Sequence, residues 1–215
     1  MIKRGNIEEI IEFFAKHDKI FVSERDLQVN FAIKLQELNN KLSVIPEYVF
    51  EDKQKKDFYH IDLVVIEDDK KRIAFEFKYV TSKFVTTINN IEYELKNHAA
   101  IDIRRIQCYK DISRLETYIK GGFDKGYLVL LTNAKGFWEG ANTPRNFELR
   151  KGKNISSGFH EAITKSEENC FAKERKGEKK GITLKKEYKV EWKDYKRFDN
   201  NPKNNIFKYL IISVM

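Results

Sequence analysis

The sequence predicts an α/β protein in which helices flank a mixed central β-sheet. One supporting observation is a capped helical segment that precedes two apolar, strand-like segments joined by a short charged turn. Another is a long helical segment followed by a further apolar strand. A strand, a long helix and a second strand in this order form a crossover connection, which favours a parallel pair of strands within a mixed sheet. We expect one domain over residues 1–215, with its core at about 23–133 and a basic elaboration of loops and strands at about 134–215.

The first helix is predicted to begin after Ser23. This residue is a suitable N-cap, and Asp26 follows it three residues later. Apolar residues then recur at helical spacing, at Leu27, Phe31, Leu35 and Leu38. Glu24 precedes the first of them by three residues, so it shares the stripe that faces the core.

Two strands are predicted downstream of this helix, at 43–51 and 60–69. The charged stretch EDDKKR forms a turn that leads into a third strand, RIAFEFKYVT, at 72–81. Here apolar residues alternate with Glu76 and Lys78, which is the pattern of a half-buried strand. An ionised carboxylate inside a core is costly without a cation, so Glu76 requires a partner, which is Lys78, a metal ion or solvent.

The turn also brings Asp62 close to Glu76. If it centres on residues 69–70, Asp62 lies level with Phe77. A register shifted by one residue instead places Asp62 opposite Glu76. In either register the two carboxylates are neighbours that repel each other and need a counter-ion. Carboxylate oxygens are the hard ligands that magnesium prefers, and Lys78 can balance charge and orient a water molecule.

The rest of the chain is predicted from the same kinds of pattern. After a polar connection, a helix is expected at 101–120 and an apolar strand at 127–133. Glycine, asparagine, serine and lysine are frequent at 136–187, where we expect surface loops with short strands. Two closing strands are predicted near 188–192 and 207–214.

The overall charge is compatible with a polyanionic partner. Lysine and arginine number 41 against 33 acidic residues, which gives a net charge of +8. Such a charge fits phosphate binding, although a solvated lysine-rich surface produces the same total. The longest apolar run near either end is too short to span a bilayer, and the acidic start does not fit a signal peptide. We therefore expect a cytoplasmic protein with no membrane partner.

Glu24, Asp62, Glu76 and Lys78 together resemble the pattern of the PD-(D/E)XK nuclease superfamily. The resemblance covers the core at about 23–133, and the segments EYELKNHAAIDIRRIQCYKDISRLE and LLTNAKGFW are similar to a narrower group of largely uncharacterised prokaryotic members. The first acid of the pattern matches Asp62, the second Glu76 and the lysine Lys78, and Glu24 fits an acid often found on the first helix. Asp62 lacks the preceding proline of the pattern, a position that the superfamily varies.

This resemblance implies a restriction-endonuclease-like fold and magnesium-dependent hydrolysis of DNA phosphodiester bonds by an endonuclease, in a restriction or other defence system. The implied metal ligands are Asp62, Glu76 and the carbonyl of Phe77, with manganese as an alternative metal. Glu24 is implied either as a ligand of a second metal ion or as a residue that holds a metal-bound water. Lys78 is implied to position the attacking water or to help deprotonate it. A homodimer and a complex with a partner subunit both remain open.

The 101–120 helix carries candidate nucleic-acid contacts. Arg104, Gln107, Asp111 and Arg114 fall on one stripe, and Lys110 lies beside it. We expect Arg104, Gln107, Lys110 and Arg114 to flank the site and contact phosphate, although ordinary ion pairing at this spacing produces the same pattern. The cationic tract at 173–186 is either a DNA-binding arm or a solvated loop.

Each predicted site residue also has a purely structural explanation. Glu24 lies in a first helical turn, where the helix dipole favours an acid. Asp62 could accept local hydrogen bonds, and Glu76 with Lys78 could form a solvated ladder. The second function class is accordingly a catalytically silent module on the same fold, which binds nucleic acid or another protein.

Overall fold

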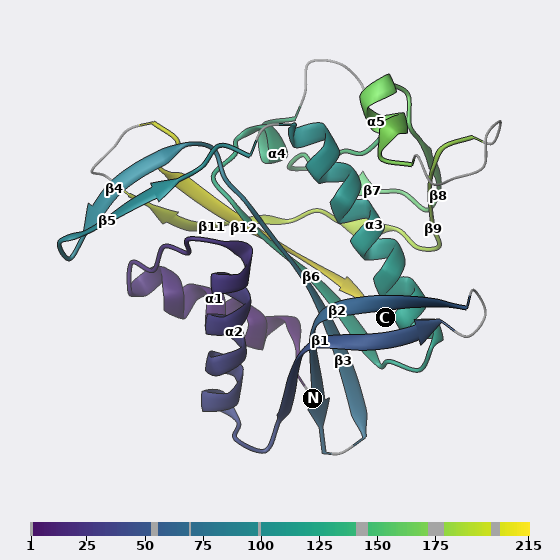
Figure 1. The fold of residues 1–215 in the computed structure, drawn as a ribbon, viewed down its shortest axis with the longest axis horizontal. Coiled ribbons are helices and arrows are strands. Elements are labelled where there is room, and N and C mark those ends of the chain that lie inside the picture. Colours follow the sequence, from purple (N-terminus) through teal and green to yellow (C-terminus); the bar gives the residue numbers. More distant parts are fainter. Residues whose placement is uncertain are drawn as a thin grey trace.

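The computed structural model describes residues 2–52, 56–68, 70–98, 100–140, 146–171, 179–198 and 203–215. Its centre is a six-stranded sheet in the order β1-β2-β3-β6-β12-β11 (Figure 1). The strands are β1 (Ser43–Asp52), β2 (Asp57–Glu67), β3 (Lys71–Val80), β6 (Lys125–Thr132), β12 (Ile206–Val214) and β11 (Trp192–Arg197). Only β3 and β6 are parallel among neighbouring strands of this sheet; the other neighbours are antiparallel. The predicted mixed α/β architecture is confirmed.

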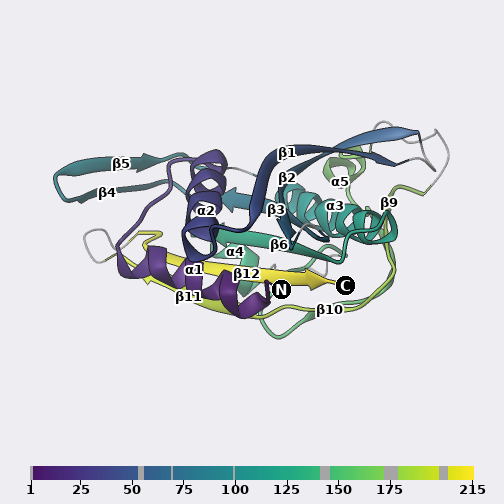
Figure 2. The same ribbon diagram turned by 90° about the horizontal axis from the view of Figure 1, so that it is seen from below.

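Helices cover both faces of the sheet. One face packs against α1 (Arg4–Lys16) and α2 (Glu24–Leu38), and the other against α3 (Ile101–Lys120). Figure 2, which views the molecule from below, shows α1 and α2 grouped together and α3 at a separate position. No helix in the described ranges is both long and apolar enough to cross a membrane.

Helix α2 begins where its sequence predicts. The Ser23 side chain accepts a hydrogen bond from the Asp26 amide at 3.1 Å, and Asp26 Oδ2 accepts one from the Val22 amide at 3.0 Å. Three of the expected apolar positions are buried, namely Leu27, Phe31 and Leu35. Leu38 is 54% exposed, so its predicted place in the core is wrong. It is the last residue of the helix, beyond the part that packs on the sheet.

Helix α1 is an addition to the predicted elements. Its buried residues, Ile7, Ile10, Ile11 and Phe14, recur at helical spacing and pack in the same cluster as α2. This short amphipathic helix gives the N-terminal segment a structural role against the sheet.

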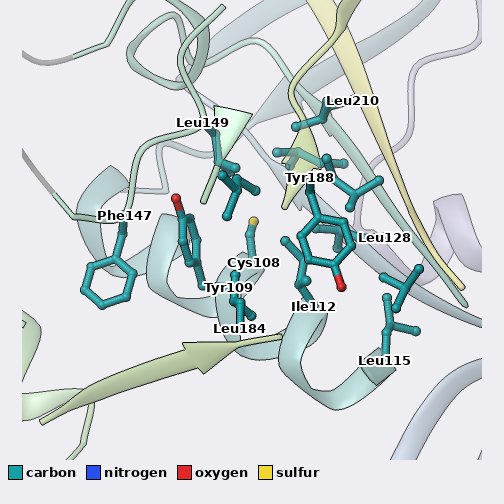
Figure 3. Packing of buried hydrophobic residues seen from close by; sticks show 14 of the residues in the cluster. Cys108, Tyr109, Ile112, Leu115, Leu128, Phe147, Leu149, Leu184, Tyr188 and Leu210 are labelled. Atoms are coloured by element: carbon teal, nitrogen blue, oxygen red, sulfur yellow. The ribbon is translucent and has the colours of Figure 1, made fainter. Parts of the chain in front are cut away.

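The β3-α3-β6 crossover is confirmed. The parallel register runs from Ile73↔Lys125 to Val80↔Thr132. The buried side of α3 packs on strand residues such as Leu128 and Leu210, and on the C-terminal segments that contain Phe147, Leu149, Leu184 and Tyr188 (Figure 3). Because α3 packs on both sides, against the sheet and against these segments, its rotation about its own axis is fixed. Its remaining side chains therefore point in defined directions.

The predicted polar connection after β3 contains a hairpin instead. Strands β4 (Phe84–Ile88) and β5 (Ile91–Leu95) pair in register and project from one end of the sheet (Figure 1). Asn89 and Asn90 form its two-residue turn, with φ of 50° and 63°. Two consecutive positive φ values are those of a type I′ turn, which asparagine tolerates better than most residues.

The C-terminal part consists of short elements, as expected. They are α4 (Gly136–Glu139), β7 (Asn154–Ile155), β8 (Gly158–Glu161), α5 (Lys165–Asn169), β9 (Gly181–Leu184) and β10 (Tyr188–Lys189). The closing strand expected near 188–192 lies mostly further on, in β11, whereas the strand expected at 207–214 is β12. Within the basic tract, residues 173–178 lie outside the described ranges, and 181–184 form β9.

Candidate active site

Strand β2 separates from β3 near the predicted site. The antiparallel ladder between them ends at Leu63↔Phe75. Its register corresponds to Asp62 opposite Glu76, which was one of the two predicted alternatives. The other register, with Asp62 level with Phe77, is wrong because the two strands pair one residue out of that register, with Leu63 opposite Phe75.

The regular alternation of β2 breaks at Asp62. Ile61 packs on the α3 side of the sheet and Leu63 on the opposite side, although residues two apart on a regular strand share a face. Glu47 of β1, which lies across from this break, has a φ of 50°. β1 and β2 therefore bend together at this point, and the β2–β3 ladder does not continue.

Beyond the end of the β2–β3 ladder, two carboxylates accept hydrogen bonds from backbone amides of β3. Asp62 Oδ2 accepts a hydrogen bond from the Phe77 amide at 2.7 Å. Glu24 Oε2, from the first turn of α2, accepts one from the Tyr79 amide at 2.9 Å. The local hydrogen bond that the structural explanation expected for Asp62 is therefore present. Glu24 faces the same site, as the sequence predicted.

Glu76 is buried on the α3 side of the sheet, with 1% of its surface exposed. Tyr118 donates a hydrogen bond from its hydroxyl to Glu76 Oε1 at 3.0 Å. Arg114 Nη2 lies 3.4 Å from Glu76 Oε2. Glu76 is therefore held by α3, and the interpretation of a solvated Glu76–Lys78 ladder is wrong.

Lys78 is held by groups from three elements. Its Nζ lies 2.9 Å from Asp111 Oδ2 on α3 and 3.9 Å from Glu24 Oε1 on α2. It also donates a hydrogen bond to the carbonyl oxygen of Phe77 at 2.8 Å. Asp111 contacts Arg114 as well, so this buried aspartate joins two cations.

The site contains more negative than positive charge. Four carboxylates, Glu24, Asp62, Glu76 and Asp111, surround Lys78 and Arg114. Burial raises the pKa of Glu24, of Asp62 and, most strongly, of Glu76, and the negative charge of Asp111 adds to each shift. Burial alone would lower the pKa of Lys78, but the carboxylates of Asp111, Glu24 and Asp62 raise it above its ordinary value.

A polar hollow of about 340 Å³ opens beside these groups. All the α3 residues that the sequence nominated as nucleic-acid contacts line it, together with site residues, as follows: Arg104, Gln107, Lys110, Arg114, Glu24, Lys78 and Asp111. The hollow is thus a place where an external group can reach both the lysine and the arginine of the site.

A larger hollow of about 1130 Å³ continues along α3. It shares Lys110 and Arg114 with the smaller one and is walled by the β1–β2 hairpin and β9. Figure 2 shows these elements together at one end of the molecule. The two hollows follow one side of α3 from Arg104 to Gly121, a distance of about 25 Å at 1.5 Å per residue.

The chemistry of the donor set fits a divalent cation. An excess of carboxylates over cations is what a hard cation with oxygen ligands neutralises. In the arrangement observed, however, no group of three or more His, Cys, Asp or Glu side chains within the described ranges is placed to hold a metal ion. The Phe77 carbonyl, an expected ligand, accepts the hydrogen bond from Lys78. Metal binding would therefore require the carboxylates to turn from their present cationic partners.

Comparisons of the chain with protein-family models, curated protein sequences and solved structures found no match.

Two residues of the site were not nominated from the sequence. Asp111 was on the predicted polar stripe of α3, but its pairing with Lys78 depends on how α3 sits on the sheet. Tyr118 had no distinguishing signal, because a tyrosine on an amphipathic helix is usually a core residue. Both become evident only when α3 is placed over β3.

Proposed function

We propose that the protein is a metal-dependent nuclease that hydrolyses DNA phosphodiester bonds, with a site of the PD-(D/E)XK type. The observation that supports this most is the proximity of Asp62, Glu76 and Lys78 where β2 leaves β3, close enough for their charges to act on one another. These three residues are two acids and a lysine, the residue types of the motif. A hollow lined by Arg104, Lys110 and Arg114 lies directly beside Lys78.

Asp62 and Glu76 would hold the metal, with Glu24 and the Phe77 carbonyl as further ligands. Magnesium is the proposed ion and manganese the alternative, because carboxylate and carbonyl oxygens suit both. When bound, such an ion polarises a phosphoryl oxygen and lowers the pKa of a coordinated water. The excess of carboxylates over cations supports this assignment.

Lys78 would act as a fixed positive charge. Its neighbouring carboxylates raise its pKa, so the ammonium keeps its protons at neutral pH and does not serve as a base. It would donate a hydrogen bond to the attacking water or to a phosphate oxygen, and thereby orient the reacting groups. Asp111 and Glu24 would hold the ammonium in place for this role.

Residues on the side of α3 that lines the smaller hollow would contact the DNA backbone. Arg104, Gln107 and Lys110 line the hollow beside Lys78, at positions where a phosphate could approach the site. The net charge of +8 supports such contacts, since lysine and arginine release counterions when they neutralise phosphates.

One observation favours a second candidate function, a catalytically silent nucleic-acid-binding module. Asp62 and Glu24 already accept hydrogen bonds from β3 amides, and Lys78 already donates a hydrogen bond to the Phe77 carbonyl. With these contacts already made within the chain, the protein could bind DNA through α3 without turnover.

Incubation of the purified protein with single-stranded, duplex and branched DNA, with magnesium, manganese or EDTA, separates the two candidates. The nuclease proposal expects metal-dependent cleavage by wild type and at least a 100-fold loss in Glu76→Gln, which keeps an oxygen for the Tyr118 hydrogen bond. Glu92→Gln, at an exposed residue of the β4–β5 hairpin, controls for the loss of one carboxylate outside the site and should cut like wild type. Binding without cleavage on every substrate would support the silent module.

A further inference from the structure

Arg114 occupies a particular position between the buried carboxylates and the open hollows. Its Nη2 contacts both Glu76 Oε2, at 3.4 Å, and Asp111 Oδ1. These two acids are almost completely buried, whereas the Arg114 side chain is 36% exposed and lines both hollows. One guanidinium therefore neutralises the inner carboxylates and is also accessible from outside.

The hydrogen bonding of this guanidinium is incomplete. Arg114 Nε is buried and has no hydrogen-bond partner in the part of the chain that the structure describes. A buried donor without an acceptor is unfavourable, and both carboxylate contacts are made through the same nitrogen. A planar guanidinium can satisfy more of its donors with a phosphate, which it often binds through two parallel hydrogen bonds.

Lys78, the other cation of the site, is held more tightly. Its side chain is 14% exposed, and it contacts Asp111, Glu24 and the Phe77 carbonyl on different sides. Of the two cations, Arg114 is therefore the one that can leave the carboxylates while the lysine stays.

We propose that Arg114 couples metal binding to DNA binding at this site, an inference that rests on the proposed nuclease function. Without metal, Arg114 is the counter-ion of Glu76 and Asp111. When a divalent cation takes over that negative charge, the guanidinium turns into the hollow and binds a backbone phosphate. Metal and DNA then strengthen each other's binding, and the factor is the same in both directions by thermodynamic linkage.

The test compares Arg114→Gln with Arg104→Gln. Both residues line the smaller hollow, and both variants lose one positive charge there. Arg104 donates to Gln107 Oε1 at 2.9 Å and makes no contact with the site carboxylates within the described ranges, so it controls for the general loss of charge. Calorimetry measures magnesium and calcium affinity without DNA. Fluorescence anisotropy measures affinity for a labelled oligonucleotide at increasing metal concentration, and a gel checks that the oligonucleotide stays intact.

For wild type, saturating metal should tighten DNA binding by about 5- to 150-fold, the usual range of coupling between sites. Arg114→Gln should bind metal alone more tightly than wild type, by about fivefold or more, because an internal competitor is gone. The effect of metal on its DNA affinity should shrink by a similar factor. Arg104→Gln should bind DNA more weakly but keep the metal affinity and the coupling of wild type.

Thermal melting and a second variant guard against a folding defect. Arg114→Gln should melt at a lower temperature than wild type in EDTA and gain more from added magnesium, because the metal replaces the missing counter-ion. Arg114→Lys keeps the charge on a compact ammonium that lacks the guanidinium fork, so it should show tighter metal binding and weaker coupling than wild type.

Unchanged metal affinity and coupling in both Arg114 variants would overturn the proposal, and so would equal effects of Arg114→Gln and Arg104→Gln. If wild type binds no divalent cation and cleaves no DNA, the proposed function fails and the coupling fails with it. If wild type cleaves and the Arg114 variants behave like wild type in the binding assays, only the coupling is wrong.

Discussion

Asp62 Oδ2 accepts a hydrogen bond from the backbone amide of Phe77 at 2.7 Å, at the point where β2 leaves β3. The side chain thus supplies an acceptor to a strand edge beyond the end of the β2–β3 ladder. Its other oxygen, Oδ1, makes no hydrogen bond within the described residues. One carboxylate can therefore satisfy the strand with one oxygen and offer the second to a metal.

Lys78→Met should abolish cleavage and retain metal binding. A methionine fills similar space but has no positive charge and no donor for the reacting groups, so we expect a rate at least 100-fold lower. Calorimetry should still detect magnesium, since an ammonium is not a ligand. A folded variant that cuts as fast as wild type would remove Lys78 from the mechanism.

The same substitution should also lower stability. Asp111 is 2% exposed and would keep only Arg114 as a cationic partner. Removal of one member of a buried ion pair typically costs about 3–5 kcal/mol, and urea unfolding in EDTA should show a loss approaching this range. An unchanged unfolding midpoint would mean that the Lys78–Asp111 contact is not maintained in solution.

Lys110→Gln should reduce the salt dependence of DNA binding. If Lys110 neutralises one backbone phosphate in the hollow, the slope of log K against log salt should become shallower by about 0.7–0.9. The matched control is Lys189→Gln, since Lys189 lies on β10 with a side chain that is 72% exposed, outside both hollows. Equal slopes for wild type and both variants would remove Lys110 from the proposed contacts.

Tyr118→Phe should destabilise the protein through Glu76. The lost hydroxyl leaves Glu76 Oε1 without its hydrogen bond at 3.0 Å, and an unsatisfied buried acceptor costs about 1–3 kcal/mol. Tyr93→Phe is the control, because the Tyr93 hydroxyl makes no hydrogen bond in the described part of the chain. Urea unfolding at neutral pH should separate the two variants, and equal midpoints would contradict the assigned contact.

His98 should contribute a loss of stability as the pH falls below about 6.5. Its Nδ1 accepts a hydrogen bond from the Thr81 amide at 3.0 Å, which requires that nitrogen to be unprotonated. Burial, aided by the charge of Arg104, lowers the pKa of His98 from its usual 6.5. Between the lowered value and 6.5 the unfolded chain binds more protons, so stability is present above this window and lost as pH falls through it.

The expected loss from His98 is less than about 1 kcal/mol, because the ring is partly exposed. His98→Gln should show a flatter stability profile between pH 7 and 5 than wild type. His60→Gln, at an exposed residue, should follow wild type. Parallel profiles for wild type and His98→Gln would contradict the role of this hydrogen bond.

Local signals were sufficient for the elements that carry the site. The Ser23 cap and the spacing of Leu27, Phe31 and Leu35 predicted α2, and the order of strand, helix and strand predicted the parallel pair of β3 and β6. The hairpin alone limited Asp62 and Glu76 to neighbouring positions. These features depend on residues close in sequence, which explains why the sequence alone could predict them.

The remaining features depend on tertiary packing or on weaker signals. The contacts of Asp111 and Tyr118 with β3 follow from the rotation of α3, which the whole core determines. Hairpin β4–β5 was missed because polar residues within its strands, such as Thr86, Thr87 and Glu92, obscure the apolar alternation. Leu38 has the right spacing for the core but lies at the helix end, so periodicity alone misplaced it.

The most direct test of the nuclease proposal is magnesium-dependent DNA cleavage by Asp62→Asn. Asparagine has nearly the same shape and keeps an oxygen for the Phe77 amide, so the variant should melt close to wild type, as circular dichroism can check. It removes the charge that would bind the metal. We predict at least a 100-fold loss of cleavage with DNA binding retained in EDTA. A folded Asp62→Asn protein that cuts DNA as fast as wild type would contradict the assignment of this site.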